Sequence, residues 1–142
     1  LELGGHPLVR RAQAQATAGG RVHVYELTWA APGMGGLLGS CHGLDVPLVF
    51  GNLKHGQTAL LIGQTPSPEA EALSACMRAA WVSFASTGDP CWPAFDLERR
   101  LVQIFDDRPT VSAYPEDASR LIWAGHTFDA LPLVRGSDDL ER

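Results

Sequence analysis

The pattern of hydrophobic and polar positions predicts helices and strands in alternation along the chain. Residues Pro7–Ala18 are rich in Ala, Gln and Arg, start with a proline and stop before Gly19, which predicts a helix. Residues Arg21–Trp29 are rich in β-branched and aromatic side chains, which predicts a strand. Their apolar residues fall at both odd and even positions, as expected of an inner strand covered on both faces.

The clearest helix is predicted over residues 68–87. Ser67 is a good N-cap, Pro68 suits the first helical position, and Gly88 is a suitable stop. The apolar residues of this segment recur at helical spacing, so they should form one buried face. That expected core face consists of Leu73, Cys76, Met77, Ala80, Trp81 and Phe84.

Shorter elements are predicted on either side of this helix. Residues 58–62 fit either a helical or an extended apolar piece. The segments 101–105 and 110–114 read as strands, and the turn between them is so short that they must be antiparallel neighbours. A last short helix is predicted over residues 116–124, and a charged tail without pattern follows Gly125.

Together these elements predict an α/β fold. We expect the strands at 22–29 and 101–105 to share one sheet, with the helix at 68–87 packed on it. With 142 residues, 45% of them hydrophobic, the chain is long enough for one modest domain with a core. It shows no internal repeat and no domain boundary.

Composition and charge narrow the range of partners. The net charge is −5 and no basic block is present, which argues against nucleic acid or an anionic membrane as a partner. No apolar run approaches the ~20 residues of a membrane helix. The first residues carry neither Met nor a signal sequence, so we expect the chain to begin inside a longer polypeptide. Three cysteines without a CxxC pair favour a reducing compartment such as the cytoplasm.

Candidate chemistry is concentrated around His42. This histidine lies between Cys41 and Gly43, just after a glycine-rich loop, and Asp45 follows three positions on. Small neighbours allow the backbone to turn tightly and leave the imidazole uncovered. A general base needs that freedom if it must reach a nucleophile supplied by another part of the fold.

This stretch resembles the histidine segment of the type-B carboxylesterases, the carboxylesterase/cholinesterase family of α/β-hydrolases. The family motif is roughly His-Gly-x-Glu-(Leu/Ile)-Pro-x-Val-Phe-Gly, and residues 42–51 give His-Gly-Leu-Asp-Val-Pro-Leu-Val-Phe-Gly. Asp45 stands where the family usually has Glu. Three more pieces are similar to the family and keep its order: the strand at 22–29, the helix at 73–90, and Trp-Pro-Ala-Phe-Asp at 92–96. The family-like part ends near residue 124 and leaves out the tail at 125–142.

The resemblance implies an α/β-hydrolase fold, hydrolysis of carboxylic esters and no cofactor. His42 would be the histidine of the catalytic triad. Because the chain order in this fold is Ser, then Asp or Glu, then His, the chain would be the C-terminal portion of a longer enzyme. No serine lies in Gly-x-Ser-x-Gly, and the glycine-rich oxyanion-hole segment would also lie upstream. The chain alone is therefore expected to be inactive.

The neighbours of His42 leave some alternatives open. Asp45 fits equally a carboxylate that steadies the histidine loop, with help from Gly43, and a solvated turn residue. It is not the triad acid, which the family places upstream. A Cys41–His42 dyad is disfavoured, because adjacent residues rarely point their side chains at each other.

Other types of site find less support in the sequence. The loop at 31–39 fails the dinucleotide fingerprint, because Leu38 stands where the third glycine is needed. The cysteines and the remaining histidines show no zinc-ligand spacing: His6, His23, His55 and His126. A different class of function stays open, that of a non-catalytic, cholinesterase-like adhesion or binding module. Without an upstream part, strand edges should be exposed, so self-association or binding of that missing part is expected.

Overall fold

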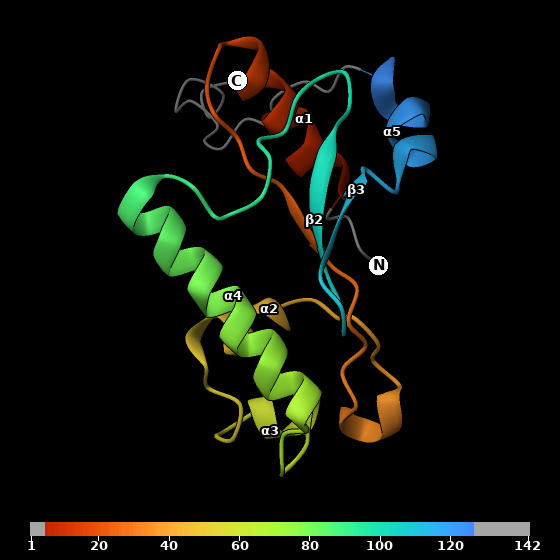
Figure 1. The fold of residues 1–142 in the computed structure, drawn as a ribbon. Coiled ribbons are helices and arrows are strands. Elements are labelled where there is room, and N and C mark those ends of the chain that lie inside the picture. Colours follow the sequence, from red (N-terminus) through yellow and green to blue (C-terminus); the bar gives the residue numbers. More distant parts are fainter. Residues whose placement is uncertain (1–4, 127–142) are drawn as a thin grey trace, which may run out of the picture.

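The computed structural model describes residues 5–126, and it has the predicted α/β fold (Figure 1). The predicted charged tail after Gly125 lies almost entirely outside the described residues. In chain order the elements are α1 (Gly5–Thr17), β1 (Tyr25–Leu27), the 3-10 helix η1 (Gly33–Gly36), α2 (Asp45–Phe50), α3 (Thr58–Ile62), α4 (Pro68–Thr87), β2 (Leu101–Phe105), β3 (Thr110–Ala113) and α5 (Asp117–Ala124).

The three strands form one sheet in the order β1-β2-β3. β1 pairs parallel to β2, with Tyr25 opposite Gln103 and Leu27 opposite Phe105. β2 pairs antiparallel to β3, as the short turn between them predicted. The expectation that the two strands near residues 25 and 103 share a sheet is confirmed.

The prediction of a long inner strand at 21–29 needs two corrections. Only three residues form β1, and within the described residues it has a hydrogen-bonded neighbour on one side only, so β2 is the central strand. The mixed apolar pattern has another cause. Val22 and Val24 pack toward the cluster around α1, whereas Tyr25 and Leu27 pack toward the cluster around α4.

Two hydrophobic clusters fill the two sides of the sheet. One joins α1 to β2 through Val9, Ala12 and Val102. The other joins α2, α4 and the sheet and includes Leu48, Met77 and Phe105, among other residues. Because successive side chains of a strand point to opposite faces, Val102 and Phe105 of the same strand serve different clusters. The fold is therefore helix, sheet, helix in three layers.

α4 has the bounds that the sequence predicted. Ser67 accepts a hydrogen bond from the Ala70 backbone N–H at 3.2 Å, and Gly88 ends the helix with φ of +76°. Its main packing partner is α2, which lies against it in Figure 1. α4 reaches the sheet through the Trp81 ring, whose centroid lies 4.9 Å from that of Tyr25.

The predicted buried face of α4 is partly wrong. Leu73, Met77 and Ala80 are buried, but Cys76 is exposed and Phe84 is 51% exposed. The buried face of α4 ends at Ala80 and includes Ala70 and Ser74 instead. Trp81 is half-buried against the core, and Phe84 lies beyond the covered part.

The remaining elements resolve the ambiguous segments. Residues 58–62 are helical as α3, and the loop at 31–39 contains η1, which packs on α3. Gly33 is required there, because a Cβ at this position would lie 2.0 Å from the Leu60 carbonyl oxygen. α5 confirms the last predicted helix, and α1 confirms the first, beginning two residues before Pro7. Proline is tolerated so early because first-turn N–H groups need no intrahelical partner.

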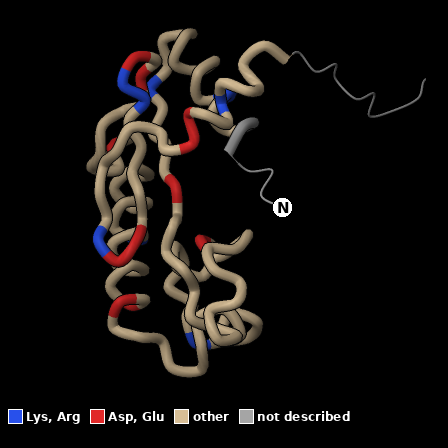
Figure 2. The backbone as a smooth tube through the Cα atoms, turned by 90° about the vertical axis from the view of Figure 1, so that its right-hand side faces the viewer, with Lys and Arg blue, Asp and Glu red and all other residues tan. Residues whose placement is uncertain are grey.

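Charged residues are dispersed over this framework. Figure 2 shows Lys and Arg as short separate segments, several of them beside Asp or Glu. The ion pairs include Arg99 with Asp96 and Arg120 with Asp117, which stand three residues apart in the sequence. No helix among residues 5–126 combines the length and the apolar character that a membrane span needs.

Candidate active-site segment

His42 lies in a turn that leads directly into α2. We call residues 39–45 the His42 turn. Gly39 and Gly43 have positive φ values of +56° and +77°, so the backbone reverses tightly on both sides of the histidine. The imidazole is exposed and makes no hydrogen bond to another described residue. The side chain is therefore free to meet a group from outside the described chain.

Two side-chain hydrogen bonds join the His42 turn to β1. Before the histidine, the Ser40 hydroxyl donates to the Leu27 carbonyl oxygen. After it, the Tyr25 hydroxyl donates to Oδ2 of Asp45 at 2.9 Å. Both partners belong to the three-residue strand β1, so the turn is attached to the sheet on each side of His42.

The Tyr25 ring is itself held by aromatic neighbours. Its centroid lies 4.9 Å from that of Trp81 and 5.8 Å from that of Phe105, both with edge-to-face geometry. Burial raises the pKa of Tyr25, and the hydrogen bond to Asp45 and the charge of that carboxylate raise it further. Tyr25 therefore stays protonated at neutral pH and remains the donor of this bond.

The start of α2 is anchored in the core. Leu44 and Leu48 are fully buried, and the buried Ser74 hydroxyl of α4 donates to the Leu48 carbonyl oxygen at 2.7 Å. Gly51 ends the helix with φ of +68°. These contacts fix the C-terminal end of the His42 turn to α4 as well as to β1.

Cys41 has a different environment from His42, although the two are adjacent. The cysteine is half-buried and packs against the core cluster that contains Leu44, whereas the histidine is exposed. In the described part of the chain no hydrogen bond joins their side chains. The geometry offers nothing to a Cys-His dyad.

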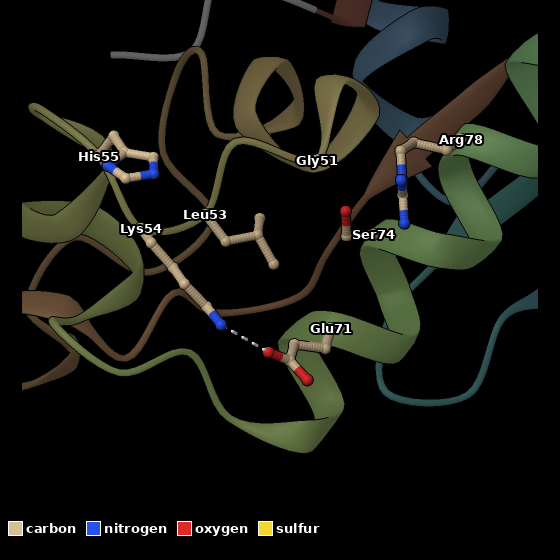
Figure 3. A pocket seen from close by; sticks show the side chains of 7 residues that line it. All are labelled: Gly51, Leu53, Lys54, His55, Glu71, Ser74 and Arg78. Atoms are coloured by element: carbon tan, nitrogen blue, oxygen red, sulfur yellow. Dashed lines mark ion pairs between the residues drawn. The ribbon is translucent and has the colours of Figure 1, made fainter.

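A hollow of about 380 Å³ lies on another part of the surface, between the end of α2 and α4 (Figure 3). Lys54 reaches across it to Glu71, with Nζ and Oε1 3.4 Å apart, and Arg78 lies over Gly51. A cation over the C-terminal end of a helix is favourable, because the helix dipole is negative there. His42 does not line this hollow. Its charged residues stabilise the packing of α2 and the following loop on α4.

Metal ligation finds no geometric basis in the described residues. Among residues 5–126, no three His, Cys, Asp or Glu side chains come together as a possible metal site. His23 is surrounded by rings instead, with Phe84 and Trp92 centroids 6.0 and 6.1 Å away.

The fold and this turn define a class of protein, the α/β-hydrolases. A solved thermophilic pNB esterase matches 82% of this chain at 30% identity with a TM-score of 0.72. The carboxylesterase EST55 of Geobacillus stearothermophilus, solved at pH 6.2, matches 81% at 32% identity with a TM-score of 0.67. Each match covers 24% of the other chain.

Sequence comparison points to one family within this class. The para-nitrobenzyl esterase of Bacillus subtilis (strain 168) is 36% identical over 84 residues, which is 56% of this chain and 17% of the relative. No family model matches the chain. In sequence and in fold, the chain corresponds to a segment of the type-B carboxylesterases. It spans about a quarter of the length of the solved relatives and 17% of the length of the Bacillus subtilis esterase.

Sequence reasoning identified His42, Gly43 and Asp45 but missed Tyr25, Ser40 and Ser74. These three form bonds to residues 20, 13 and 26 positions away in the sequence, so no local pattern marks them. One signal was available for Tyr25. It is a polar-tipped aromatic residue in the strand before the histidine loop, and a half-buried tyrosine hydroxyl usually finds a partner.

Proposed function

We propose that this chain supplies the catalytic histidine of a serine carboxylesterase, with His42 as general base and general acid. It would be the C-terminal portion of that enzyme, family-like over residues 1–124. The observation that carries the proposal is the exposed imidazole, which has no hydrogen-bond partner among residues 5–126, on a turn attached to the sheet at both ends. The similarity to carboxylesterases in sequence and fold supports it.

His42 would move one proton through each half of the reaction. It accepts the proton of the serine hydroxyl as the serine oxygen bonds to the ester carbonyl carbon. It then donates that proton to the alcohol oxygen as the ester C–O bond breaks, which leaves an acyl-serine. A water molecule then bonds to the acyl carbon while His42 accepts its proton, and His42 returns that proton to the serine oxygen as the acyl–serine bond breaks and the carboxylic acid leaves. No cofactor takes part.

The serine, the triad acid and the oxyanion hole would come from outside these 142 residues. None of the serines lies in Gly-x-Ser-x-Gly. The chain alone is therefore expected to hydrolyse no ester above the rate of free imidazole.

Asp45 and Gly43 would support the histidine without touching the substrate. The hydrogen bond from Tyr25 favours the role in which Asp45 steadies the loop over that of a solvated turn residue. Gly43 adopts φ of +77°, which a residue with a side chain rarely does. Together they would let the backbone turn sharply just after His42.

We also propose that the isolated chain self-associates, in competition with the missing part of the enzyme. Within the described residues β1 lacks a neighbour on one side, and an unpaired edge invites another strand. Val82 and Phe84 add exposed apolar surface on α4. Light scattering at tens of micromolar, about the range of weak interfaces, should show a dimer.

The variant Phe84→Asp should shift that dimer toward monomer. Leu121→Asp is the matched control, because Leu121 is also exposed but lies on α5. A monomeric unmodified chain, or equal effects of the two variants, would refute this part of the proposal.

The test of the catalytic role is a chimera in which residues 7–124 replace the matching segment of the Bacillus subtilis para-nitrobenzyl esterase. We expect it to hydrolyse a nitrophenyl ester. His42→Gln should lower the rate on the order of 10⁴-fold, because proton transfer and orientation fail together. His55→Gln is the matched control, since His55 is also exposed and lies outside the His42 turn. A His42→Gln chimera that hydrolyses the ester at nearly the unmodified rate would show that His42 is not the base.

A further inference from the structure

The position of the His42 imidazole follows that of its turn. Among the described residues the imidazole has no hydrogen-bond partner of its own. The turn contains Gly39 and Gly43, and glycine gives the backbone the widest choice of conformations. Something outside the turn must restrict that choice if the imidazole is to meet a reacting group.

We infer that Tyr25 and Ser40 are positioning residues, which together hold the His42 turn on strand β1. This inference rests on the proposed role of His42 and adds two residues that the sequence pattern did not indicate. Tyr25 holds the turn through Asp45 after the histidine, and Ser40 holds it through Leu27 before the histidine. A hydrogen bond on each side leaves the turn little freedom to rotate.

The support behind these two bonds is rigid. β1 is paired in register with β2 along all three of its residues. The Tyr25 ring packs edge-to-face on both Trp81 and Phe105, and these contacts restrict the movement of its hydroxyl away from Asp45. The hydroxyl is only half-buried, and its acceptor is a carboxylate. A hydrogen bond to a charged acceptor stabilises more than one between neutral groups.

The consequence concerns geometry, not proton transfer. Neither Tyr25 nor Ser40 needs to touch a substrate. Loss of the two hydrogen bonds should leave the chain folded but allow the imidazole to take more than one position. A misplacement of about 1 Å can lower a catalytic rate about 10²-fold. The two bonds therefore fix the position of His42 relative to the sheet.

Amide hydrogen exchange on the 142-residue chain tests this without any ester hydrolysis. The backbone N–H groups of Leu44, in the His42 turn, and of Val46, just after it in α2, donate to the carbonyl oxygens of Cys41 and Gly43, each at 3.2 Å. Tyr25→Phe removes one hydroxyl and should speed exchange at these two amides about tenfold, the effect of losing one hydrogen bond to a charged group. Asp45→Ala should act alike, and the double variant no more strongly.

Matched controls separate positioning from general packing. Asp45→Asn keeps an acceptor oxygen but loses its charge, so its exchange rate should lie between those of the unmodified chain and Asp45→Ala. Tyr114→Phe makes the same chemical change at a tyrosine outside the turn and should leave both amides unaffected. For the other attachment, Ser40→Ala should speed exchange in the turn, whereas Ser86→Ala, which removes a similar bond within α4, should not.

Two results would overturn the inference. In one, Tyr25→Phe and Asp45→Ala leave exchange at Leu44 and Val46 unchanged. In the other, they accelerate exchange equally throughout the chain. If Tyr25→Phe fails to fold, Asp45→Ala tests the same bond from its other end. Because the readout is exchange, the inference stands or falls separately from the chimera: a His42→Gln chimera with undiminished activity, together with a tenfold local effect on exchange, rejects the catalytic role of His42 but keeps the attachment.

Discussion

Two connections of this protein are held in opposite ways. The His42 turn is held by side-chain bonds that cross 13 and 20 residues of sequence. In the connection after α4, residues 88–100, the side-chain hydrogen bonds go to near neighbours, and the link to the sheet is a backbone bond from the Phe95 N–H to the Val22 carbonyl oxygen at 2.7 Å. Asp89 accepts from the Cys91 N–H at 2.8 Å, and Asp96 accepts from the Glu98 N–H at 3.0 Å.

The difference decides what each connection can do. Bonds between near neighbours form whenever the local backbone turns, so they stabilise a shape without reference to the rest of the fold. Bonds to β1 exist only when the sheet is built. The position of His42 is therefore a property of the whole fold, whereas the turns at Asp89 and Asp96 depend on their own backbone.

The largest expected effect is a core substitution beneath the His42 turn. Leu44 is 0% exposed, and Leu44→Ala should lower the free energy of unfolding by about 2–5 kcal/mol through lost burial and a cavity. Leu97 is the matched leucine of the other connection and is 47% exposed. Leu97→Ala should therefore change the free energy of unfolding by less than about 0.5 kcal/mol. Urea unfolding measures both, and equal effects would remove the distinction between the two connections.

A smaller effect should appear at alkaline pH. Burial and Asp45 raise the pKa of Tyr25 above its ordinary value of about 10. Burial, followed by the charges of Glu116 and Glu26, raises the pKa of Tyr114 to about 12. The folded chain holds both phenolic protons more tightly than the unfolded chain does. Their contribution to stability is therefore complete below pH 10 and is lost as the pH rises through the folded pKa values.

The two tyrosines report on the two connections separately. Tyr25 is bonded to the His42 turn, and Tyr114 packs in the cluster with Phe95 of the other connection. The urea midpoint of the unmodified chain should fall between pH 8 and pH 11. The fall should be smaller for Tyr25→Phe, and also smaller for Tyr114→Phe. When the three chains are compared at the same pH, amide hydrogen exchange at Leu44 should be faster only in Tyr25→Phe. Identical pH losses in all three chains would contradict the pKa assignments.

The parts of the fold that sequence predicted are those with local causes. α4 begins at Ser67 and ends at Gly88 because a cap and a left-handed glycine act on their own neighbours. The exposure of Phe84 was not predictable, since helical spacing cannot show that the buried face of α4 ends at Ala80. α2 itself was not predicted as a helix, because Pro47 obscures an apolar run, although proline is tolerated in a first turn.

The site divides along the same line. His42 and Asp45 were found through a contiguous motif, and the catalytic role of His42 stays a prediction. Tyr25 and Ser40 could not be found, because their partners come together only once β1, the turn and α2 have met. Ser74 is a similar case, since its bond to Leu48 joins α4 to α2. Contiguous chemistry can be predicted from sequence, whereas its support requires the fold.

The central claim is that His42 transfers the proton, and chemical rescue tests it most directly. In the chimera, His42→Ala should lose on the order of 10⁴-fold in turnover of a nitrobenzyl ester. Added imidazole should restore part of that turnover above its own background rate, because it can occupy the vacated space and accept the serine proton. His55→Ala should need no rescue and show none. A His42→Ala chimera that works at nearly the full rate without imidazole would contradict the account.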